Sequence, residues 1–504
     1  MTPSEILQIG LSISLQPANL AFAFIGAVIG TLVGVLPGLG PAAALALLLP
    51  VSFGMSPVGA IIMLAGIYYG AQYGGSTTSI LVNIPGEASS IVTCLDGYQM
   101  ARRGDAGPAL AMAAIGSFVA GTAGTLGLML LAPPLVQFAL SFGPPEYVGL
   151  IFLGFVTLTF MAQGSMLKAL MMTALGLFLS TVGLDEVSGV ARFTFGVTEM
   201  LDGVDLVPAV MGLFGVSEVL INLEAGLRRQ DVFAQKIRGV LPSREELRRS
   251  TGPVARGTVL GFLLGILPGG GSILSAFVSY AVEKRLSKHP ERFGTGMIEG
   301  VAGPEAANNA GATGAFIPLL TLGLPTNAVV AILLGALMIH GVEPGPLVMR
   351  NHPDIFWGVI FSMYVGNAML LVLNLPLIGL WVRLLRVPYP LLFPLILLFC
   401  LIGAYSIANS PSNIFMMLGM GLVGYWMRKT RYEAAPLVVA LVLGTPFEAA
   451  LRQSLILSGG SFAIFFTRPI ALVLMAAALA LLALAVVGGT RARMQARGFV
   501  DAGT

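Results

Sequence analysis

The chain is a succession of long apolar runs that are interrupted, at several places, by glycine and proline. The first run extends from about Ala18 to Leu36, and two shorter ones follow over Ala42–Leu49 and Met55–Tyr69. A transmembrane helix needs about 20 apolar residues, so these runs predict an all-α polytopic membrane protein with about 10–13 membrane segments. The later apolar runs lie near residues 107–132, 147–164, 166–183, 204–222, 356–382, 388–408, 412–427, 434–447 and 469–488.

The interruption after the first run has a second copy in the other half of the chain. Gly30–Pro41 and Gly261–Ser272 both contain Gly-x-x-x-Gly-x-Leu-Pro-Gly-x-Gly, at an offset of 231 residues. Backbone groups cannot face lipid unpaired, so a helix break inside a membrane must lie within protein or beside a wet cavity. Matching breaks in two halves of a chain indicate the binding site of a transporter. Because Ala42–Leu49 is too short to cross a membrane, it predicts half of a re-entrant helical hairpin.

A second pair of interruptions follows the first pair in the same order. Asn83-Ile-Pro-Gly86 matches Leu324-Pro-Thr-Asn327 at an offset of 240 residues, and the hydroxyl-rich stretch Tyr73–Ser79 precedes the first of them. We expect Tyr73–Ser79 to belong to the break. The breaks are colinear in the two halves, so the sequence predicts an internal repeat with broken helices and two re-entrant hairpins whose tips converge.

The placement of charge divides the chain and indicates its orientation. Residues 1–100 contain no Lys or Arg, whereas residues 224–256 are polar and rich in arginine. Basic loops of this length stay on the cytoplasmic side of a membrane. We therefore expect a first membrane repeat over 1–223, a basic cytoplasmic linker over 224–256, and a second repeat with extra C-terminal spans over 257–504. If the first half starts outside the membrane and the second half starts on the cytoplasmic side, the two halves form an inverted repeat. The alternative is a parallel duplication.

Composition agrees with a membrane location. The chain is 56% hydrophobic and 10% charged, against about 25% charged in soluble domains. Cys94 and Cys400 lie in separate apolar regions and the three histidines are scattered, so neither a disulfide nor a metal site is predicted. We expect no cofactor apart from a coupling Na⁺ or H⁺, no nucleic-acid partner, and no cleaved signal peptide, since no basic region precedes the first apolar run.

The glycines at the breaks have two interpretations. Glycine allows a ligand to approach the backbone, and it also allows two helices to pack closely. We assign Gly30, Gly34, Gly261 and Gly265 to helix packing. We assign the following glycines to substrate binding: Gly38, Gly40, Gly86, Gly269, Gly270 and Gly271.

Polar side chains beside the breaks are the other candidates for substrate binding. Broken helices expose N–H groups that suit an anion, and amides or hydroxyls in a membrane interior need a partner. The alternative for each residue is a local helix cap. The candidates are Ser76, Thr77, Thr78, Ser79, Asn83, Ser272, Asn308, Asn309, Thr326 and Asn327.

Three acidic residues lie near the breaks. A carboxylate inside a membrane is by default a functional hypothesis. These residues are Glu87, Glu299 and Glu305, and we take Glu87 and Glu305 as candidates for binding a coupling ion. The alternative is that these carboxylates lie at the mouths of the hairpins and pair with Arg102 or Arg103.

Together these motifs resemble a known family. The repeated Gly-Pro motif, the stretch Tyr73–Glu87 and Gly303-Pro-Glu-Ala-Ala-Asn-Asn309 resemble the large membrane subunit (TctA family) of the tripartite tricarboxylate transporters, over roughly residues 15–490. The resemblance implies a bacterial inner-membrane permease that works with a small membrane subunit and a periplasmic solute-binding protein. It also implies transport of small organic anions such as citrate, driven by an ion gradient.

Two other classes of function compete with a secondary transporter. An ion or solute channel would conduct without a binding protein. An intramembrane enzyme would need a nucleophile with a base, or a metal cluster, and the scattered histidines argue against it. The chain has no Gly-x-x-x-x-Gly-Lys-Ser/Thr motif, which argues against ATP as its energy source. We expect alternating access, with an elevator-like motion implied by similarity to other binding-protein-dependent carriers.

Overall fold

The computed structural model describes residues 2–36, 40–162, 165–185, 187–224, 241–384 and 389–484, and these residues are mostly helical. In the first part of the chain the elements are α1 (Pro3–Ser14), α2 (Pro17–Val35), α3 (Pro41–Leu48), η1 (Pro50–Gly54), α4 (Pro57–Val82), η2 (Ala88–Ser90), α5 (Ile91–Arg103), α6 (Ala106–Ala139), α7 (Pro144–Phe160), α8 (Met166–Ser180), β1 (Gly183–Leu184), β2 (Ala191–Arg192), η3 (Thr198–Met200), α9 (Leu206–Val210), η4 (Met211–Val216) and α10 (Ser217–Glu224).

The second part contains a similar series of helices and, among its described residues, no strand. Its elements are α11 (Arg244–Ile266), α12 (Gly271–Leu286), η5 (Pro290–Arg292), α13 (Glu299–Gly314), α14 (Phe316–Leu322), α15 (Ala328–Ile339), α16 (Val348–Asn351), α17 (Pro353–Asn374), α18 (Ile378–Leu384), α19 (Tyr389–Ala408), α20 (Pro411–Lys429), α21 (Ala434–Leu457) and α22 (Ile464–Thr467). The all-α prediction is confirmed. The two short strands pair antiparallel, Gly183 with Arg192 and Leu184 with Ala191.

Several helices are long and apolar enough to cross a membrane. Among the described residues there are five of at least 18 residues, and five shorter apolar helices accompany them. The chain is thus a multi-pass membrane protein. The total of 10–13 segments, the inverted orientation and the re-entrant hairpins stay predictions. The long spans are Pro17–Val35, Ala106–Ala139, Leu206–Glu224, Pro353–Asn374 and Ala434–Leu457.

Helix starts follow local sequence signals. Pro17 and Pro57 occupy the first turns of α2 and α4, where the missing N–H costs no hydrogen bond. Ser243 caps α11 in a capping box with Glu246. That cap lies inside the segment predicted as a polar linker, so from Arg244 onward this segment is helical; residues 225–240 lie outside the described part of the chain.

The hydroxyl-rich stretch before the second break is not itself broken, and that prediction was wrong. Helix α4 runs without interruption to Val82, and the chain leaves it at Asn83, whose φ of 59° is left-handed. Within the helix, Ser76 Oγ lies 3.1 Å from the Gln72 carbonyl oxygen, within hydrogen-bonding distance. A buried hydroxyl can thus be satisfied inside a continuous helix by the carbonyl one turn earlier, which sequence alone does not distinguish from a break.

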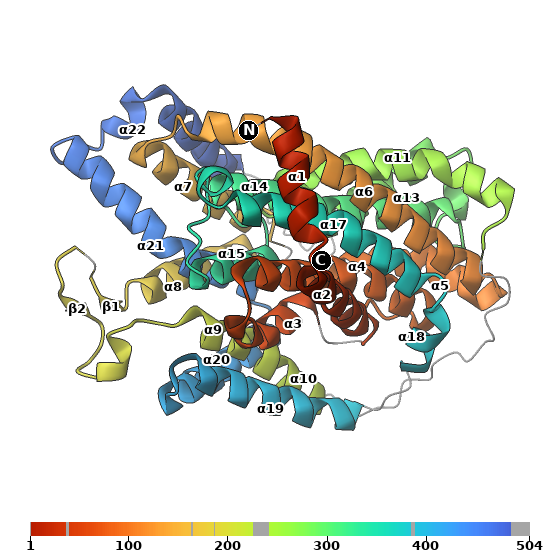
Figure 1. The fold of residues 1–504 in the computed structure, drawn as a ribbon, viewed down its shortest axis with the longest axis horizontal. Coiled ribbons are helices and arrows are strands. Elements are labelled where there is room, and N and C mark those ends of the chain that lie inside the picture. Colours follow the sequence, from red (N-terminus) through yellow and green to blue (C-terminus); the bar gives the residue numbers. More distant parts are fainter. Residues whose placement is uncertain are drawn as a thin grey trace, which may run out of the picture. The chain divides into compact units, whose positions relative to one another are not determined.

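Glycines place two equivalent helix pairs in very close contact. α2 packs along α4, and α11 packs along α13, and both pairs are visible in Figure 1. A Cβ added at Gly30 would lie 2.5 Å from the Ile67 carbonyl oxygen. A Cβ added at Gly34 would collide with the Ala71 carbonyl oxygen. Gly261 and Gly265 are packed in the same way against α13. The packing role assigned to these four glycines agrees with this geometry, since only a residue without Cβ permits such approach.

By their contacts, the residues form two compact units. Unit 1 comprises Met1–Ala139 and Asp205–Trp426, and unit 2 comprises Leu140–Val204 and Met427–Thr504. These units are groups of packed helices and not the two sequence repeats. The repeat boundaries predicted from sequence therefore stay a prediction. The glycine-lined helix pairs and all of the helix breaks described below belong to unit 1.

Candidate functional site

Glu305, on α13, is the centre of a buried polar cluster in unit 1. Its side chain is 0% exposed. Ser76 Oγ of α4 donates to one carboxylate oxygen at 2.5 Å, and Thr93 Oγ1 of α5 donates to the other. The two donors come from the first half of the chain and the acceptor from the second. This carboxylate therefore joins the predicted repeats through hydroxyl groups.

Glu87 lies in the same cluster, directly after the break that follows α4. It accepts from the backbone N–H of Ser89 at 3.1 Å and from the Ser89 hydroxyl. Asn308 Nδ2 of α13 lies 3.4 Å from Glu87 Oε1, which is a long hydrogen bond. The hydroxyl of Ser89 also lies 2.8 Å from Gln72 Oε1. Like Glu305, Glu87 is thus held by hydroxyl and amide donors.

Neither carboxylate forms an ion pair with any residue that the structure describes. The expected alternative, pairing with Arg102 or Arg103, is not found; Glu299 pairs with Arg249 instead, at 2.8 Å. An ionised carboxylate in a low-dielectric interior is costly unless a proton or a cation neutralises it. The amide oxygen of Asn308 is buried and has no hydrogen-bond partner among the described residues, so the cluster retains an unused acceptor beside Glu87.

The two breaks in the second half of the chain meet each other. The backbone N–H of Gly269 donates to the Thr326 carbonyl at 2.8 Å. Gly269 and Gly271 have φ values of 77° and 49°, in the left-handed region that favours glycine. A Cβ added at Gly271 would lie 3.3 Å from Asn327 Nδ2, so the N-termini of α12 and α15 are adjacent.

Asn327 connects this junction to α4. Its side chain caps α15 by accepting from Val330 N at 3.0 Å, and its Nδ2 lies 3.2 Å from the Tyr68 hydroxyl. Ser272, which is 6% exposed, directly follows Gly271 at the same junction. The structure thus brings Ser272, Thr326 and Asn327 together, as a group that includes a helix cap.

The other predicted hydroxyls and amides have separate environments. Thr78 Oγ1 donates to the Val35 carbonyl at 2.8 Å and so satisfies the C-terminal end of α2. Thr77 lines a small cavity of about 10 Å³, about the space of one water molecule. Asn309 Nδ2 donates to Ser117 Oγ at 2.7 Å. Asn83 is exposed and does not join the buried cluster.

The glycines assigned to binding also differ from one another. A Cβ at Gly86 would collide with the Gly34 carbonyl, and one at Gly270 would lie 2.5 Å from the Leu264 carbonyl oxygen, so close packing accounts for both. A Cβ at Gly40 would meet no atom of the described residues within 4 Å. Gly38 lies outside the described residues.

Sequence reasoning missed several members of the cluster. Thr93 and Ser89 donate to the two carboxylates. Gln72 lies beside Ser89 in the same cluster, whereas Tyr68 belongs to the separate junction at Asn327. Ser89 and Thr93 are four residues apart and Glu87 precedes them, which is a spacing that places polar groups on one side of a helix start. That pattern was available in the sequence. Tyr68 lies within an apolar run and gives no comparable signal.

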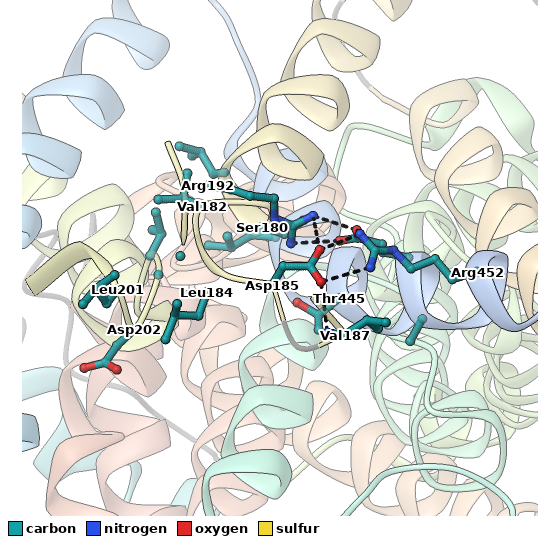
Figure 2. Close-up of a pocket in the computed structure, with 17 residues that line it drawn as sticks. Ser180, Val182, Leu184, Asp185, Val187, Arg192, Leu201, Asp202, Thr445 and Arg452 are labelled. Carbon is teal, nitrogen blue, oxygen red and sulfur yellow. Dashed lines mark hydrogen bonds and ion pairs between the residues drawn. The ribbon is translucent and has the colours of Figure 1, made fainter. Parts of the chain in front are cut away.

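Unit 2 contains charged residues of a different kind. Asp185, in the loop after β1, accepts from Arg452 Nη2 at 2.6 Å and lies 3.2 Å from Arg192 Nη1. Glu448 lies 2.7 Å from both arginines. The four side chains line a pocket of about 200 Å³, in which Figure 2 shows Arg192 and Arg452 converging on Asp185. Hydrogen bonds from Arg452 and from the backbone of Ser188 hold the pKa of Asp185 well below its usual range.

The chain was compared with known proteins. It is 51% identical over 487 residues to the "Uncharacterized 52.8 kDa protein in TAR-I ttuC' 3'region" of Agrobacterium vitis, which covers 97% of each chain. It is 49% identical over 233 residues to the "Uncharacterized protein in TAR-II ttuC' 3'region" of the same organism, which covers 46% of this chain and 96% of that relative. No solved structure gives a significant match.

A family model accounts for most of the chain. The model described as "Tripartite tricarboxylate transporter TctA family" matches residues 20–439. The matched region includes every helix break and the whole Glu87–Glu305 cluster. The resemblance inferred from the repeated motifs is confirmed: the chain belongs to the TctA family, the large membrane subunit of the tripartite tricarboxylate transporters.

Proposed function

We propose that this subunit is the permease of a secondary transporter that imports small organic carboxylates, of the dicarboxylate or tricarboxylate type, with a Na⁺ or H⁺ gradient. Membership of a tripartite transporter family supports transport as the class of function. The observation that carries the proposal further is the pair of buried carboxylates, Glu87 and Glu305, which have hydroxyl and amide partners from both halves of the chain.

The coupling ion would act at these two carboxylates. A proton on either group, or a Na⁺ between the carboxylates and amide oxygens, neutralises the buried charge. The unpartnered oxygen of Asn308 is available as a further ligand. Binding of the ion would then change the charge of the junction between the repeats, and this is a physical means of coupling an ion gradient to a conformational change.

The substrate would bind near the junction of the second-repeat breaks. The adjacent N-termini of α12 and α15 carry partial positive charge, which suits a carboxylate. Ser272 and Asn327 offer side-chain hydrogen bonds at the same place. We assign four glycines to backbone that the substrate contacts directly: Gly38, Gly40, Gly269 and Gly271. Asn309 and Thr326 would hold the surrounding polar groups in place by hydrogen bonds.

Transport would follow alternating access, with the helices that carry the breaks moving in an elevator-like manner against a scaffold that includes residues 147–183 and 388–427. The subunit would lie in the bacterial inner membrane and work with a small membrane subunit and a periplasmic solute-binding protein. An inverted repeat predicts that a cysteine introduced near residue 5 is labelled from outside and one near residue 240 from inside. Labelling of both from the same side would exclude the inverted arrangement.

Uptake of radiolabelled carboxylates tests the function. Cells that contain all three subunits should accumulate one member of a panel of di- and tricarboxylates, and only when the binding protein is present and an ion gradient is imposed. Selective collapse of the Na⁺ or the H⁺ gradient identifies the coupling ion. Flux that does not saturate and needs neither the gradient nor the binding protein would indicate a channel and contradict the proposal.

A further inference from the structure

A third group of charged residues lies where α11 begins and α12 ends, outside the cluster assigned to transport. It lines a pocket of about 440 Å³. Four of its side chains are arginine or lysine and three are glutamate, so positive charge is in excess. The lining cations are Arg249, Arg256, Lys288 and Arg292, and the lining carboxylates are Glu245, Glu283 and Glu299.

Two of the arginines are held in fixed orientations. Arg249 donates from Nε and Nη2 to the two oxygens of Glu299, at 2.8 and 2.9 Å. Arg256 donates in the same way to Glu283, at 2.8 and 2.6 Å. A guanidinium has five N–H donors, and this side-on pairing leaves its Nη1 group outside the ion pair. Both arginine side chains remain 43% exposed, so further acceptors can reach them.

The same face of α11 is apolar farther along the helix. Arg249, Arg256 and Leu263 are spaced by seven residues, which places them on one side of a helix. Leu263 and Leu267 are 55% and 48% exposed, which in a membrane protein makes an apolar surface suited to contact with lipid. The opposite side, through Gly261 and Gly265, packs against α13. The cationic pocket and the exposed apolar stripe therefore lie on the same face of α11.

We infer that this pocket binds the phosphate of an anionic phospholipid, whose acyl chains lie along Leu263 and Leu267. Basic pockets between membrane helices bind lipid head groups by this combination of charge and apolar surface. Leu286, which is 60% exposed, and the buried Phe293 add apolar area at the pocket itself. A soluble phosphate would use the cations and leave the stripe uncovered, so the stripe favours a lipid.

The test measures binding of phosphatidylglycerol and of phosphatidylcholine to the purified full-length chain, by native mass spectrometry or titration in detergent. Phosphatidylglycerol should bind more tightly. The variant K288Q/R292Q removes two exposed cations without breaking the arginine–glutamate pairs, and should weaken phosphatidylglycerol binding by about 30-fold, at about 1 kcal/mol for each cation. The matched control is K284Q/R285Q, which removes the same charge from α12 at two residues that do not line the pocket.

Glycerol 3-phosphate separates the lipid from a soluble anion. The variant L263S/L267S should weaken phosphatidylglycerol binding and leave glycerol 3-phosphate binding unchanged. Equal binding of both lipids, or equal losses in K288Q/R292Q and K284Q/R285Q, would overturn the assignment. Glycerol 3-phosphate that binds as tightly as phosphatidylglycerol would also overturn it. A partner subunit that cross-links at residue 263 and displaces the lipid would do the same. None of these readouts depends on transport activity.

Discussion

Unit 1 and unit 2 each contain a pair of carboxylates, both buried in unit 1 and one buried, one half-buried in unit 2. The negative charge of the two pairs is neutralised in different ways. Glu87 and Glu305 are held by serine, threonine and asparagine, and they form no ion pair with the described residues. Asp185 and Glu448 are held by Arg192 and Arg452.

This difference has a functional meaning. An arginine keeps its partner carboxylate ionised and in place, because the positive guanidinium stabilises the negative form of the carboxylate. Removing either charge leaves the other without a partner. Hydroxyl and amide donors fix the position of a carboxylate but do not supply the missing charge. The cluster in unit 1 can therefore exchange a proton or cation, whereas the ionic cluster in unit 2 is suited to clamping the β1–β2 loop onto α21.

The largest effect is expected from removing the charge of Glu305. Glu305→Gln keeps the size of the side chain and one acceptor oxygen, and its NH2 group can donate to the other hydroxyl once that hydroxyl rotates, so folded protein should persist. Gradient-driven accumulation of substrate should fall by about tenfold or more, which corresponds to about 1.4 kcal/mol. Uptake normalised to the amount of protein in the membrane measures this. Normal accumulation in Glu305→Gln, and also in Glu87→Gln, would refute the coupling role.

A substitution in the ionic cluster of unit 2 should lower stability and leave uptake unchanged. Arg452→Gln leaves Asp185 and Glu448 with a single arginine, and unpaired charge with little exposure destabilises a fold. The thermal midpoint of the purified protein should decrease by a few degrees, while uptake per folded molecule stays near that of the wild type. If Arg452→Gln abolished uptake at unchanged stability, the distinction between the two clusters would be lost.

Two glycines in the first half of the chain sharpen the distinction between packing and binding. Gly34→Ala forces a methyl group against the Ala71 carbonyl and should reduce the folded yield, at a cost of about 1–3 kcal/mol for overpacking. Gly40→Leu has open space at its Cβ and should fold normally, yet impair uptake by occupying room for the substrate. Quantitative membrane immunoblots combined with uptake separate these outcomes. Equal loss of protein in both variants would contradict the assignment of Gly40.

The smallest expected effect is a dependence of stability on pH. The pKa of Asp185 is lower in the folded chain than in the unfolded chain, so its stabilisation is complete above the ordinary aspartate pKa of about 3.9 and is lost as pH falls below it. The thermal midpoint should therefore decrease with acidification in this range, and less steeply in Asp185→Asn than in the wild type. Parallel curves for the two proteins would show that Asp185 does not contribute.

Much of the molecule follows from sequence patterns that act locally. Apolar runs of membrane length predict the helices, and the first predicted span, Ala18–Leu36, differs by one residue at each end from α2 (Pro17–Val35). Glycine, proline and asparagine have fixed backbone preferences, so the breaks near Pro85, Pro268 and Pro325 could be located. The duplicated motif also identified the family, since an order of several breaks is a property of the chain alone.

Tertiary structure decided which groups meet. Ser76 and Thr93 reach Glu305 from positions 229 and 212 residues away, and neither pairing leaves a local trace in the sequence. The pairing of Glu299 with Arg249, instead of Arg102 or Arg103, depends equally on how helices pack. Hydrogen bonds and ion pairs form between groups that close packing brings within about 3 Å. Here the packing depends on helix faces lined by glycine, which contact helices that lie far along the chain. For this reason the sequence indicated the helices, the breaks and the acidic residues, and only the folded chain determined that two of those carboxylates lack arginine.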